Sequence, residues 1–530
     1  MNGPQIVPYR GVGEWALALG QAYDNPFVDV IVDAEFTAPS GARRIMPAFY
    51  DGGNTWRVRF SPDEAGTWRL HIRTMPREDM PEQEAIFQVT PREARGTLCA
   101  TPGEAWGFAY SSGEPAFLLG DTVYNLFGMA HCGGDVEGFM RRRAGQGINL
   151  LRVRVPVSPF HPPRGYSDWQ TRRTWPWGGS EQAPQFDRFN LDYFGTVDRV
   201  VREAESLGLG LEMIMEGWGF EFPFARRDVF LPEWEDLWMR YLIARYDAFN
   251  CVFIWTLMNE YEFYPDGDWR YSRISDLWAM RRARWVKALA PHGHVVAVHN
   301  GPRLPRFADR FRRDPGAIDA IMFQDWGSRD EEHGWLADGI EDIIAAALDG
   351  WWGSAVFAEW GYERNPALEL KMPSHLYCDV EHTRRGAWRG AFCGLGIIHG
   401  FENSWGPWML LDEDQPGLAM LQRVHHFFTQ VAPFTALRPA ADLVTGGPWP
   451  RGCRPLALAS EDGALAAVYL PVGGEVALAL PRGGAGYVAE WYCPVNGTLR
   501  PAQGGEGHYV APPAEHLGHP QDWVLLLRAT

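Results

Sequence analysis

Acidic residues and tryptophans follow several short apolar segments in the middle of the chain. Glu260 ends the segment FIWTLMNE, Glu359 follows SAVFA, and Glu216 follows GLEMIM. Trp218 and Trp405 lie just beyond two such segments. Two carboxyl groups across a glycosidic bond can protonate the leaving oxygen and attack the anomeric carbon or activate water, and tryptophan faces can hold a sugar ring. The pattern therefore predicts chemistry on a carbohydrate that two of these carboxyl groups carry out.

Further polar side chains near the ends of these segments are candidates for substrate contacts. They are Asp121, Tyr124, Arg152, His161, Asn259, His299, Gln324 and Asn403. Asp121 either holds substrate hydroxyls or bonds the backbone at its turn. Glu216 is the rival candidate for a direct catalytic role, and is otherwise a substrate contact or an ion-pair partner at the rim. Trp405 is expected to stack on a sugar. The sequence contains no His-Glu-x-x-His zinc pattern and no Gly-x-Ser-x-Gly elbow, so we expect neither a metal site nor a cofactor.

Eight short apolar segments alternate with stretches of helical period between about residues 97 and 432. The predicted strands are 116–120, 149–155, 210–215, 252–257, 295–298, 320–323, 355–358 and 396–401. The predicted helices are 135–144, 193–206, 233–245, 272–289, 335–348, 383–391 and 417–431, and only the connection between the fifth and sixth strands lacks a clear helix. Eight parallel strands with covering helices form an α/β (β/α)8 TIM barrel, whose working residues project from the carboxyl ends of the strands. A doubly wound sheet is the alternative, but no Gly-x-Gly-x-x-Gly follows an early strand.

The residues before and after this region alternate between apolar and polar positions instead. In the first part, short runs such as TWRVRF at 55–60 are separated by turn sequences such as DGGN at 51–54. Similar runs follow residue 433, separated by Gly- and Pro-rich turns. This spacing is typical of antiparallel sandwiches. The sequence therefore predicts three domains, which are an N-terminal β-sandwich at 1–95, the barrel at 96–432 and a C-terminal β-sandwich at 433–530.

Several motifs carry a family resemblance. The segment FIWTLMNE at 253–260 resembles the strand-four signature of clan A retaining glycoside hydrolases, and VFAEWG at 356–361 and GINLLR at 147–152 are similar to the strand-seven and strand-two segments of that clan. LGDT at 119–122 and WYCPVNG at 491–497 resemble the apiosidase-like barrel family and its C-terminal sandwich, and YDNPF at 23–27 resembles an N-terminal sandwich that often precedes such barrels.

The resemblance implies a role for four residues. Asn259 would supply a substrate-binding amide, Glu260 the acid/base, Glu359 the nucleophile, and Arg152 support for that nucleophile. One departure from the clan pattern follows the sixth strand, where Gln324 and its neighbours stand in place of an expected tyrosine near the nucleophile.

Composition and charge narrow the classes of partner. The 530 residues include 49 basic and 66 acidic ones, and the net charge of −17 repels a phosphate backbone. No apolar run is long enough to span a membrane, the first residues lack the pattern of a secretory signal, and the seven scattered cysteines include no CxxC pair. We therefore expect a cytoplasmic protein whose partner is an oligosaccharide or glycoside, with neither nucleic acid nor membrane; a homo-oligomer is compatible with the sequence.

The combined prediction is a retaining glycosidase that is exo-acting on short oligosaccharides. Two alternatives stay open. The first is a non-catalytic carbohydrate-binding or scaffold protein with the same domains. The second is a transglycosylase, which would use the same covalent intermediate and intercept it with a sugar.

Overall fold

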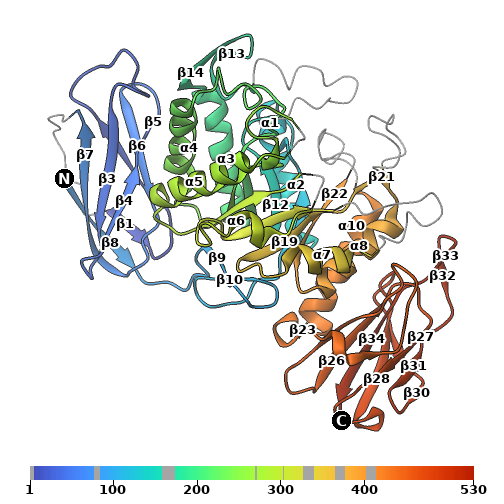
Figure 1. The fold of residues 1–530 in the computed structure, drawn as a ribbon. Helices are drawn as coiled ribbons and strands as arrows, with labels where there is room; N and C mark the ends of the chain where they lie inside the picture. Colours follow the sequence, from blue (N-terminus) through green and yellow to red (C-terminus); the bar gives the residue numbers. More distant parts are fainter. Residues whose placement is uncertain are drawn as a thin grey trace.

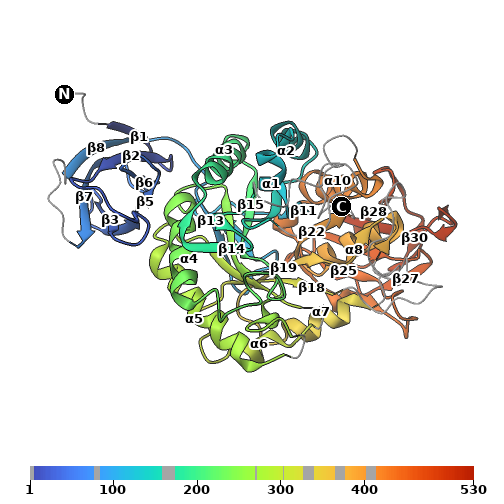
Figure 2. The ribbon, with the colours of Figure 1, turned by 90° about the horizontal axis from the view of Figure 1, so that it is seen from above.

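A computed structural model of the chain describes residues 5–76, 84–157, 174–268, 271–301, 304–325, 339–364, 377–401 and 414–530. Sheet-rich regions lie at its two ends, and a barrel ringed by helices lies between them (Figure 1). The view from above in Figure 2 shows the N-terminal sheets on one side of the barrel and the C-terminal sheets on the other. Three predicted site residues, His161, Asn403 and Trp405, lie outside the described residues.

The central sheet is a closed parallel barrel. Its strands are β11 (Leu119–Thr122), β12 (Leu150–Arg154), β15 (Gly210–Glu216), β16 (Val252–Met258), β17 (Val295–His299), β18 (Ala320–Gln324), β19 (Ser354–Glu359) and β22 (Gly396–Phe401). Each strand pairs in parallel with the next, and β11 also pairs with β22, which closes the sheet. Every residue of these strands is buried, because side chains fill the interior and helices cover the outside. The predicted barrel is confirmed.

The first barrel strand begins later than predicted, at Leu119 rather than at residue 116. The backbone N–H of Ala116 donates to the carbonyl of Phe108 over 2.9 Å. Ala116 thus extends the hairpin of β9 (Leu98–Ala100) and β10 (Phe108–Tyr110). Parallel pairing within the barrel therefore starts only beyond this contact.

Helices surround the barrel. They are α1 (Leu126–His131), α2 (Val136–Gly145), α3 (Leu191–Leu207), α4 (Pro232–Tyr246), α5 (Arg273–Leu289), α6 (Phe307–Phe311), α7 (Ile340–Leu348), α8 (Val380–Phe392) and α10 (Pro416–His426). Local sequence sets their limits. Asn190 caps α3 by accepting the N–H of Tyr193, and Gly208, with a φ of 64°, ends that helix in the left-handed conformation that glycine tolerates.

Two connections differ from the sequence-based prediction. The connection between the fifth and sixth barrel strands does carry a helix, α6, whose two buried phenylalanines pack on Trp351. Five residues are too few to show a helical period, which is why the pattern missed it. The helix predicted at 335–348 begins at Ile340 as α7, and residues 335–338 lie outside the described part of the chain.

Two sheets form the N-terminal part. One contains β1 (Gln5–Pro8), β8 (Glu84–Thr90), β7 (Gly66–Met75), β3 (Ile31–Thr37) and β4 (Arg43–Pro47), and the other contains β2 (Gly13–Ala18), β6 (Thr55–Phe60) and β5 (Phe49–Tyr50). Their apolar faces share one core, in which Phe36 of the first sheet stacks on Phe60 of the second with ring centroids 4.0 Å apart. The period-two alternation thus places one face of each sheet inside.

Two sheets with a shared core form most of the C-terminal part, beside a short pair of strands, β32 (Glu515–His516) and β33 (His519–Pro520). One contains β23 (Arg438–Pro439), β25 (Leu456–Ala459), β26 (Leu465–Leu470), β34 (Trp523–Ala529), β28 (Tyr487–Tyr492) and β29 (Leu499–Pro501), and the other contains β24 (Val444–Thr445), β27 (Glu475–Leu478), β31 (His508–Val510) and β30 (Gly504–Gly505). Val468 and Leu525 of the first sheet and Val476 of the second belong to one core. The sheets lie where the sequence predicted β structure, and the domain boundaries at 95/96 and 432/433 stay predictions.

Buried arginines connect both terminal regions to the barrel through hydrogen bonds and ion pairs. Arg59 of β6 donates to Asp198 of α3 over 3.2 Å and to the carbonyl of Arg245 over 2.7 Å. At the other end, Arg384 of α8 donates to Asp522 over 2.9 Å, and both side chains are fully buried. Because a buried charge without its partner is costly, these contacts tie the terminal sheets to the barrel.

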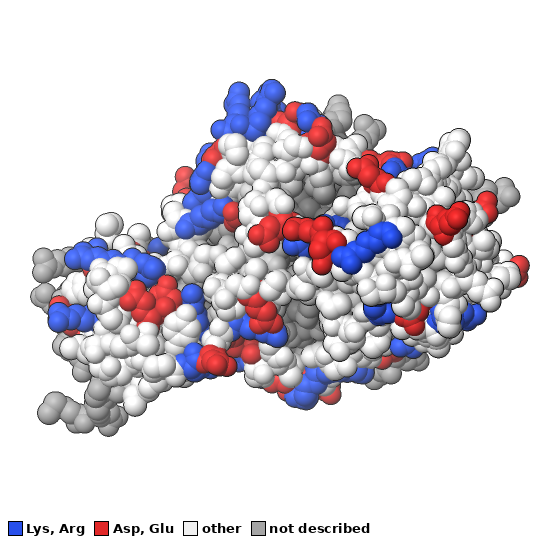
Figure 3. Space-filling model, turned by 90° about the horizontal axis from the view of Figure 1, so that it is seen from below, with Lys and Arg blue, Asp and Glu red and all other residues white. Residues whose placement is uncertain are grey.

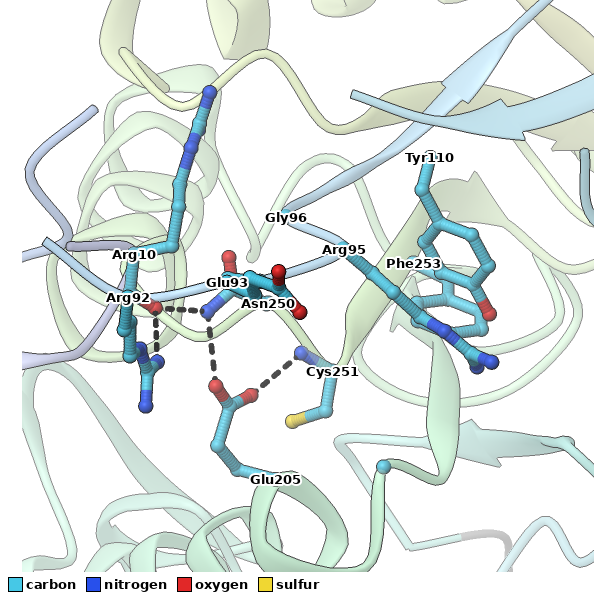
Figure 4. A pocket seen from close by; sticks show the side chains of 12 residues that line it. Arg10, Arg92, Glu93, Arg95, Gly96, Tyr110, Glu205, Asn250, Cys251 and Phe253 are labelled. Atoms are coloured by element: carbon cyan, nitrogen blue, oxygen red, sulfur yellow. Dashed lines mark hydrogen bonds between the residues drawn. The ribbon is translucent and has the colours of Figure 1, made fainter. Parts of the chain in front are cut away.

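A cavity of about 270 Å³ lies under the segment that joins the N-terminal sheets to the barrel. As the dashed lines of Figure 4 show, the carbonyl of Arg10 accepts from Arg92 and Asn250, and Glu205 accepts from Asn250 and from the N–H of Cys251. Asn250 and Cys251 precede β16. The cavity is therefore at the amino ends of the barrel strands, opposite the end that carries the predicted catalytic residues.

The cysteines form no disulfide bonds, and charged side chains of both signs lie on the surface. All seven cysteines are free. On the face shown in Figure 3, acidic and basic side chains are intermingled, so the net negative charge is not gathered in one patch of that face. Among the described residues, none of the helices combines the length and the apolar character that crossing a membrane requires.

Candidate active site

Glu359, at the carboxyl end of β19, is surrounded by three hydrogen-bond donors. Its Oε1 accepts from the hydroxyl of Tyr124 over 2.7 Å and from Nη1 of Arg152 over 2.6 Å. Its Oε2 accepts from the hydroxyl of Tyr362, in β20 (Tyr362–Glu363), over 2.9 Å. The Glu359 side chain is only 3% exposed. Both carboxyl oxygens are therefore fixed in one orientation beside a positive charge, an arrangement that suits a nucleophile.

The two tyrosine hydroxyls act as donors. Burial raises the pKa of Tyr124 and the pKa of Tyr362 well above the usual range, so both hydroxyls keep their protons. Tyr124 was predicted as a substrate contact, and here it bonds Glu359. The sequence analysis did not single out Tyr362, although it stands only three residues after Glu359. The clan pattern led us to expect one tyrosine near the nucleophile after the sixth strand. Two tyrosine hydroxyls contact Glu359 instead, one after the first barrel strand and one after the seventh.

Arg152 of β12 contacts four side chains. Besides its bond to Glu359, its Nη1 donates to the hydroxyl of Tyr124 over 3.0 Å, its Nη2 donates to Oδ1 of Asn259, and its Nε lies 3.5 Å from Oε2 of Glu212. Burial opposes a charge there, but the nearby acidic groups raise the pKa of Arg152, so the guanidinium stays charged. The contact with Glu359 is the one that the resemblance implied. Glu212 was not predicted, and its only signal was a charged residue within an otherwise apolar strand.

Glu260 follows β16 in the left-handed backbone conformation, with a φ of 54°. This conformation is costly for residues other than glycine and is found at functional sites. Oε1 of Glu260 accepts from Nε2 of Gln324 over 3.0 Å. Burial of the carboxyl group and the negative charge of Glu359 raise the pKa of Glu260 to about 8, against the opposing effect of donors from Gln324 and Trp218. Glu260 is therefore protonated at neutral pH, as a general acid must be.

His299, at the end of β17, lies between the two glutamates. Its Nδ1 accepts the backbone N–H of Glu260 over 3.4 Å, and its Nε2 lies 3.4 Å from Oε1 of Glu359. Burial and the charge of Arg152 lower the pKa of His299 well below its usual value, so the ring is neutral. We assign its proton to Nε2, because Nδ1 serves as an acceptor.

Asn259 presents a donor within the site. Its Oδ1 faces Arg152, which fixes the orientation of the amide. Its buried Nδ2 has no hydrogen-bond partner within the described part of the chain. An unpaired buried N–H is costly, and a substrate hydroxyl could satisfy it.

Asp121 and Glu216 both face arginines. Nε of Arg143 donates to Oδ2 of the buried Asp121 over 2.7 Å. Nη2 of Arg227 donates to Oε2 of Glu216 over 2.6 Å, and burial raises the pKa of Glu216 while the charge of Arg227 opposes that effect. For Glu216 this contact is the ion-pair alternative that the sequence left open.

Trp218 belongs to the same end of the barrel. Its ring contacts Tyr124, with ring centroids 5.2 Å apart, and the guanidinium of Arg154 lies 4.6 Å from the ring. Within the described residues, no group of three or more His, Cys, Asp or Glu side chains is arranged to hold a metal ion. The structure thus brings together seven predicted residues, which are Tyr124, Arg152, Asn259, Glu260, His299, Gln324 and Glu359.

Comparisons with known proteins place this chain in a family. Residues 106–423 match the family described as the apiosidase-like catalytic domain, and residues 11–75 match a domain of unknown function, DUF5060. No curated protein matches the sequence.

Solved structures share the fold. A candidate glycoside hydrolase from Bacteroides vulgatus superposes with a TM-score of 0.73 at 16% identity, covering 99% of this chain and 100% of that one. A family 5 glycoside hydrolase from the same organism superposes with a TM-score of 0.62 at 18% identity, covering 82% of this chain and 93% of that one. The family match spans more than half of the chain and contains every residue of the site described above, so this protein belongs to the apiosidase-like catalytic domain family.

Proposed function

We propose that this protein is a retaining glycoside hydrolase in which Glu359 is the nucleophile and Glu260 is the acid/base. The single observation that carries the proposal is the difference between the two carboxyl groups. Glu359 is held by Arg152, Tyr124 and Tyr362, whereas the pKa of Glu260 is raised to about 8. A nucleophile must be ionised and an acid must be protonated, so the two roles require carboxyl groups in different environments.

The reaction would proceed in two steps. In the first, Oε1 or Oε2 of Glu359 attacks the anomeric carbon, the glycosidic bond breaks, and Glu260 gives its proton to the leaving oxygen. In the second, the Glu260 carboxylate takes a proton from water, which attacks the anomeric carbon and releases Glu359. Asn259 would donate its free Nδ2 hydrogen to a sugar hydroxyl, and Arg152 would hold both Asn259 and the nucleophile in place.

The test is a screen of p-nitrophenyl pyranosides and furanosides, followed by proton NMR of the first-formed product of any substrate that is cleaved. Retention of the anomeric configuration is the expected result. Inversion would contradict the assignment of Glu359 as a nucleophile. Failure to cleave any member of the panel or any short oligosaccharide would favour the non-catalytic carbohydrate-binding alternative.

We also propose that the enzyme is exo-acting on short oligosaccharides. Single sugars should then be released from chain ends, which thin-layer chromatography of partial digests would show. A transglycosylase would instead give longer products when acceptor sugar is added. A cytoplasmic location, tested by fractionation of the source cells, completes the proposal.

A further inference from the structure

The amide of Gln324 lies between Glu260 and the end of the neighbouring strand. Nε2 of Gln324 donates to Oε1 of Glu260 over 3.0 Å and to the backbone carbonyl of Asn300 over 3.1 Å. A backbone carbonyl can only accept, so this contact identifies the nitrogen of the Gln324 amide. Both hydrogens of that nitrogen are therefore committed, one of them to Glu260.

Asn300 holds Gln324 from two further directions. Oδ1 of Asn300 accepts the backbone N–H of Gln324 over 2.9 Å, and Nδ2 of Asn300 donates to the backbone carbonyl of Gln324 over 3.3 Å. Asn300 is fully buried and Gln324 is 4% exposed. The backbone and the side chain of Gln324 are thus both bonded to Asn300. Among the described residues, Asn300 has no hydrogen bond to either catalytic glutamate.

Asn300 is itself anchored at the end of β17. The backbone N–H of the next residue, Gly301, donates to Oε2 of Glu262. A Cβ at Gly301 would lie 2.8 Å from that oxygen, so a larger residue would displace the Glu262 carboxyl group from this contact. A continuous set of hydrogen bonds therefore runs from Glu262 through Gly301, Asn300 and Gln324 to Glu260.

We propose that Asn300 and Gln324 are positioning residues that hold the Glu260 carboxyl group in the orientation in which it delivers its catalytic proton. This inference rests on the proposed glycosidase function. An amide N–H can only donate, so the bond from Gln324 fixes Oε1 of Glu260 as an acceptor. Trp218 is a second donor to the same carboxyl group, and the two donors together fix its orientation.

The same contact serves both steps of the reaction. When Glu260 gives up its proton, the electron pair of that O–H bond stays on the carboxylate, which keeps the N–H of Gln324 as a partner. When Glu260 later takes a proton from water, the contact is unchanged. Gln324 was predicted as a substrate contact, and in this arrangement its amide hydrogens serve Glu260 and Asn300 instead.

Leaving-group dependence tests the proposal with the full-length enzyme. Gln324→Met removes the donor, and Asn300→Leu removes its support. The substrates are an alkyl glycoside, which needs acid assistance, and a dinitrophenyl glycoside of the same sugar, which does not. For the alkyl glycoside we expect kcat/KM to fall about tenfold to a hundredfold in both variants, and for the dinitrophenyl glycoside by less than about threefold. The basic limb of the kcat/KM profile for the alkyl glycoside should also move to higher pH, because a donor that favours the ionised form is lost.

Asn149→Leu is the matched control. Asn149 also bonds a neighbouring strand through both ends of its amide, accepting from the N–H of Leu119 over 3.0 Å and donating to the carbonyl of Phe117 over 2.6 Å. It stands at the amino end of the barrel strands, before β12. A loss of stability without any change in the ratio between the two substrates is expected for this variant.

The outcomes separate this inference from the proposed function. If the wild-type enzyme cleaves the glycosides but both variants lose activity equally on the two substrates with an unmoved basic limb, the positioning role is wrong and the glycosidase function stands. If the wild-type enzyme cleaves none, the proposed function itself fails. A neutron structure of the wild-type protein below pH 7 gives a second measurement that needs no variant to fold. Deuterium atoms on Nε2 of Gln324 that point at Oε1 of Glu260 and at the carbonyl of Asn300 support the proposal, and a Gln324 amide whose oxygen faces Glu260 overturns it.

Discussion

The hydroxyl of Tyr362 donates to Oε2 of Glu359 over 2.9 Å, from a position three residues later in the chain. The oxygen on the other side of the same carboxyl group is taken by Tyr124 and Arg152. Each oxygen of Glu359 thus has its own donor from a different segment.

Removal of the Tyr362 hydroxyl should impair the attack by Glu359. Hydrogen bonds to charged groups contribute about 1.5–3 kcal/mol, so we expect Tyr362→Phe to lower kcat/KM by about tenfold to a hundredfold. Steady-state kinetics on the best aryl glycoside measure this. Tyr246→Phe is the control, because the buried Tyr246 hydroxyl has no hydrogen-bond partner among the described residues. Equal losses in the two variants would mean that the Tyr362 bond to Glu359 is not used in catalysis.

The pH dependence of activity should report Glu260. Its pKa is raised to about 8 by burial and by the charge of Glu359. The acid must be protonated to assist departure, so kcat/KM for a substrate with a poor leaving group should fall as the pH rises above about 8. A dinitrophenyl glycoside should lose this limb, since its departure needs no proton. A basic limb that stays identical for both substrates would assign it to another group.

Azide should distinguish the two catalytic glutamates. In Glu260→Ala the nucleophile remains, so an activated glycoside still forms the covalent intermediate, and azide in the vacated space gives a glycosyl azide with the configuration of the substrate. In Glu359→Ala no intermediate forms, and azide replaces the nucleophile to give the inverted product. Proton NMR reads both configurations. Swapped configurations would reverse the assignment, and full activity of either variant would remove that residue from the mechanism.

The C-terminal sheets should be structural partners of the barrel and not tethered modules. Removing one partner of a buried ion pair costs about 3–5 kcal/mol, so Arg384→Ala, which leaves the buried Asp522 carboxylate without its arginine, should lower the melting temperature strongly. Arg226→Ala, which breaks an exposed pair with Asp228, should leave it unchanged. Calorimetry provides the comparison. Similar melting temperatures for both variants, together with X-ray scattering that shows separated mobile domains, would contradict a docked arrangement.

Much of the barrel could be predicted from the sequence because the signals for its strands are local. Each buried strand of the barrel is a short apolar run with a polar residue at its carboxyl end, and parallel strands bring such ends to one rim. Glu260, Glu359, Asn259 and Arg152 could therefore be placed near that rim, and the resemblance of segments such as FIWTLMNE to clan A glycoside hydrolases implied their roles. The same reasoning missed α6, since five residues carry no period, and it began β11 too early, since a hairpin contact at Ala116 competes with the barrel.

The partners of these side chains were decided only by the tertiary structure. Tyr124 and Tyr362 reach Glu359 from segments more than two hundred residues apart in the chain, and no local pattern marks a hydroxyl as a donor to a particular carboxyl group. The raised pKa of Glu260 likewise depends on burial and on the position of Glu359, neither of which is a property of the residue itself. Sequence determined the residue types and the strand ends at which they stand. Closure of the barrel set the distances between those ends, and with them the charge, orientation and proton position on which the proposed chemistry depends.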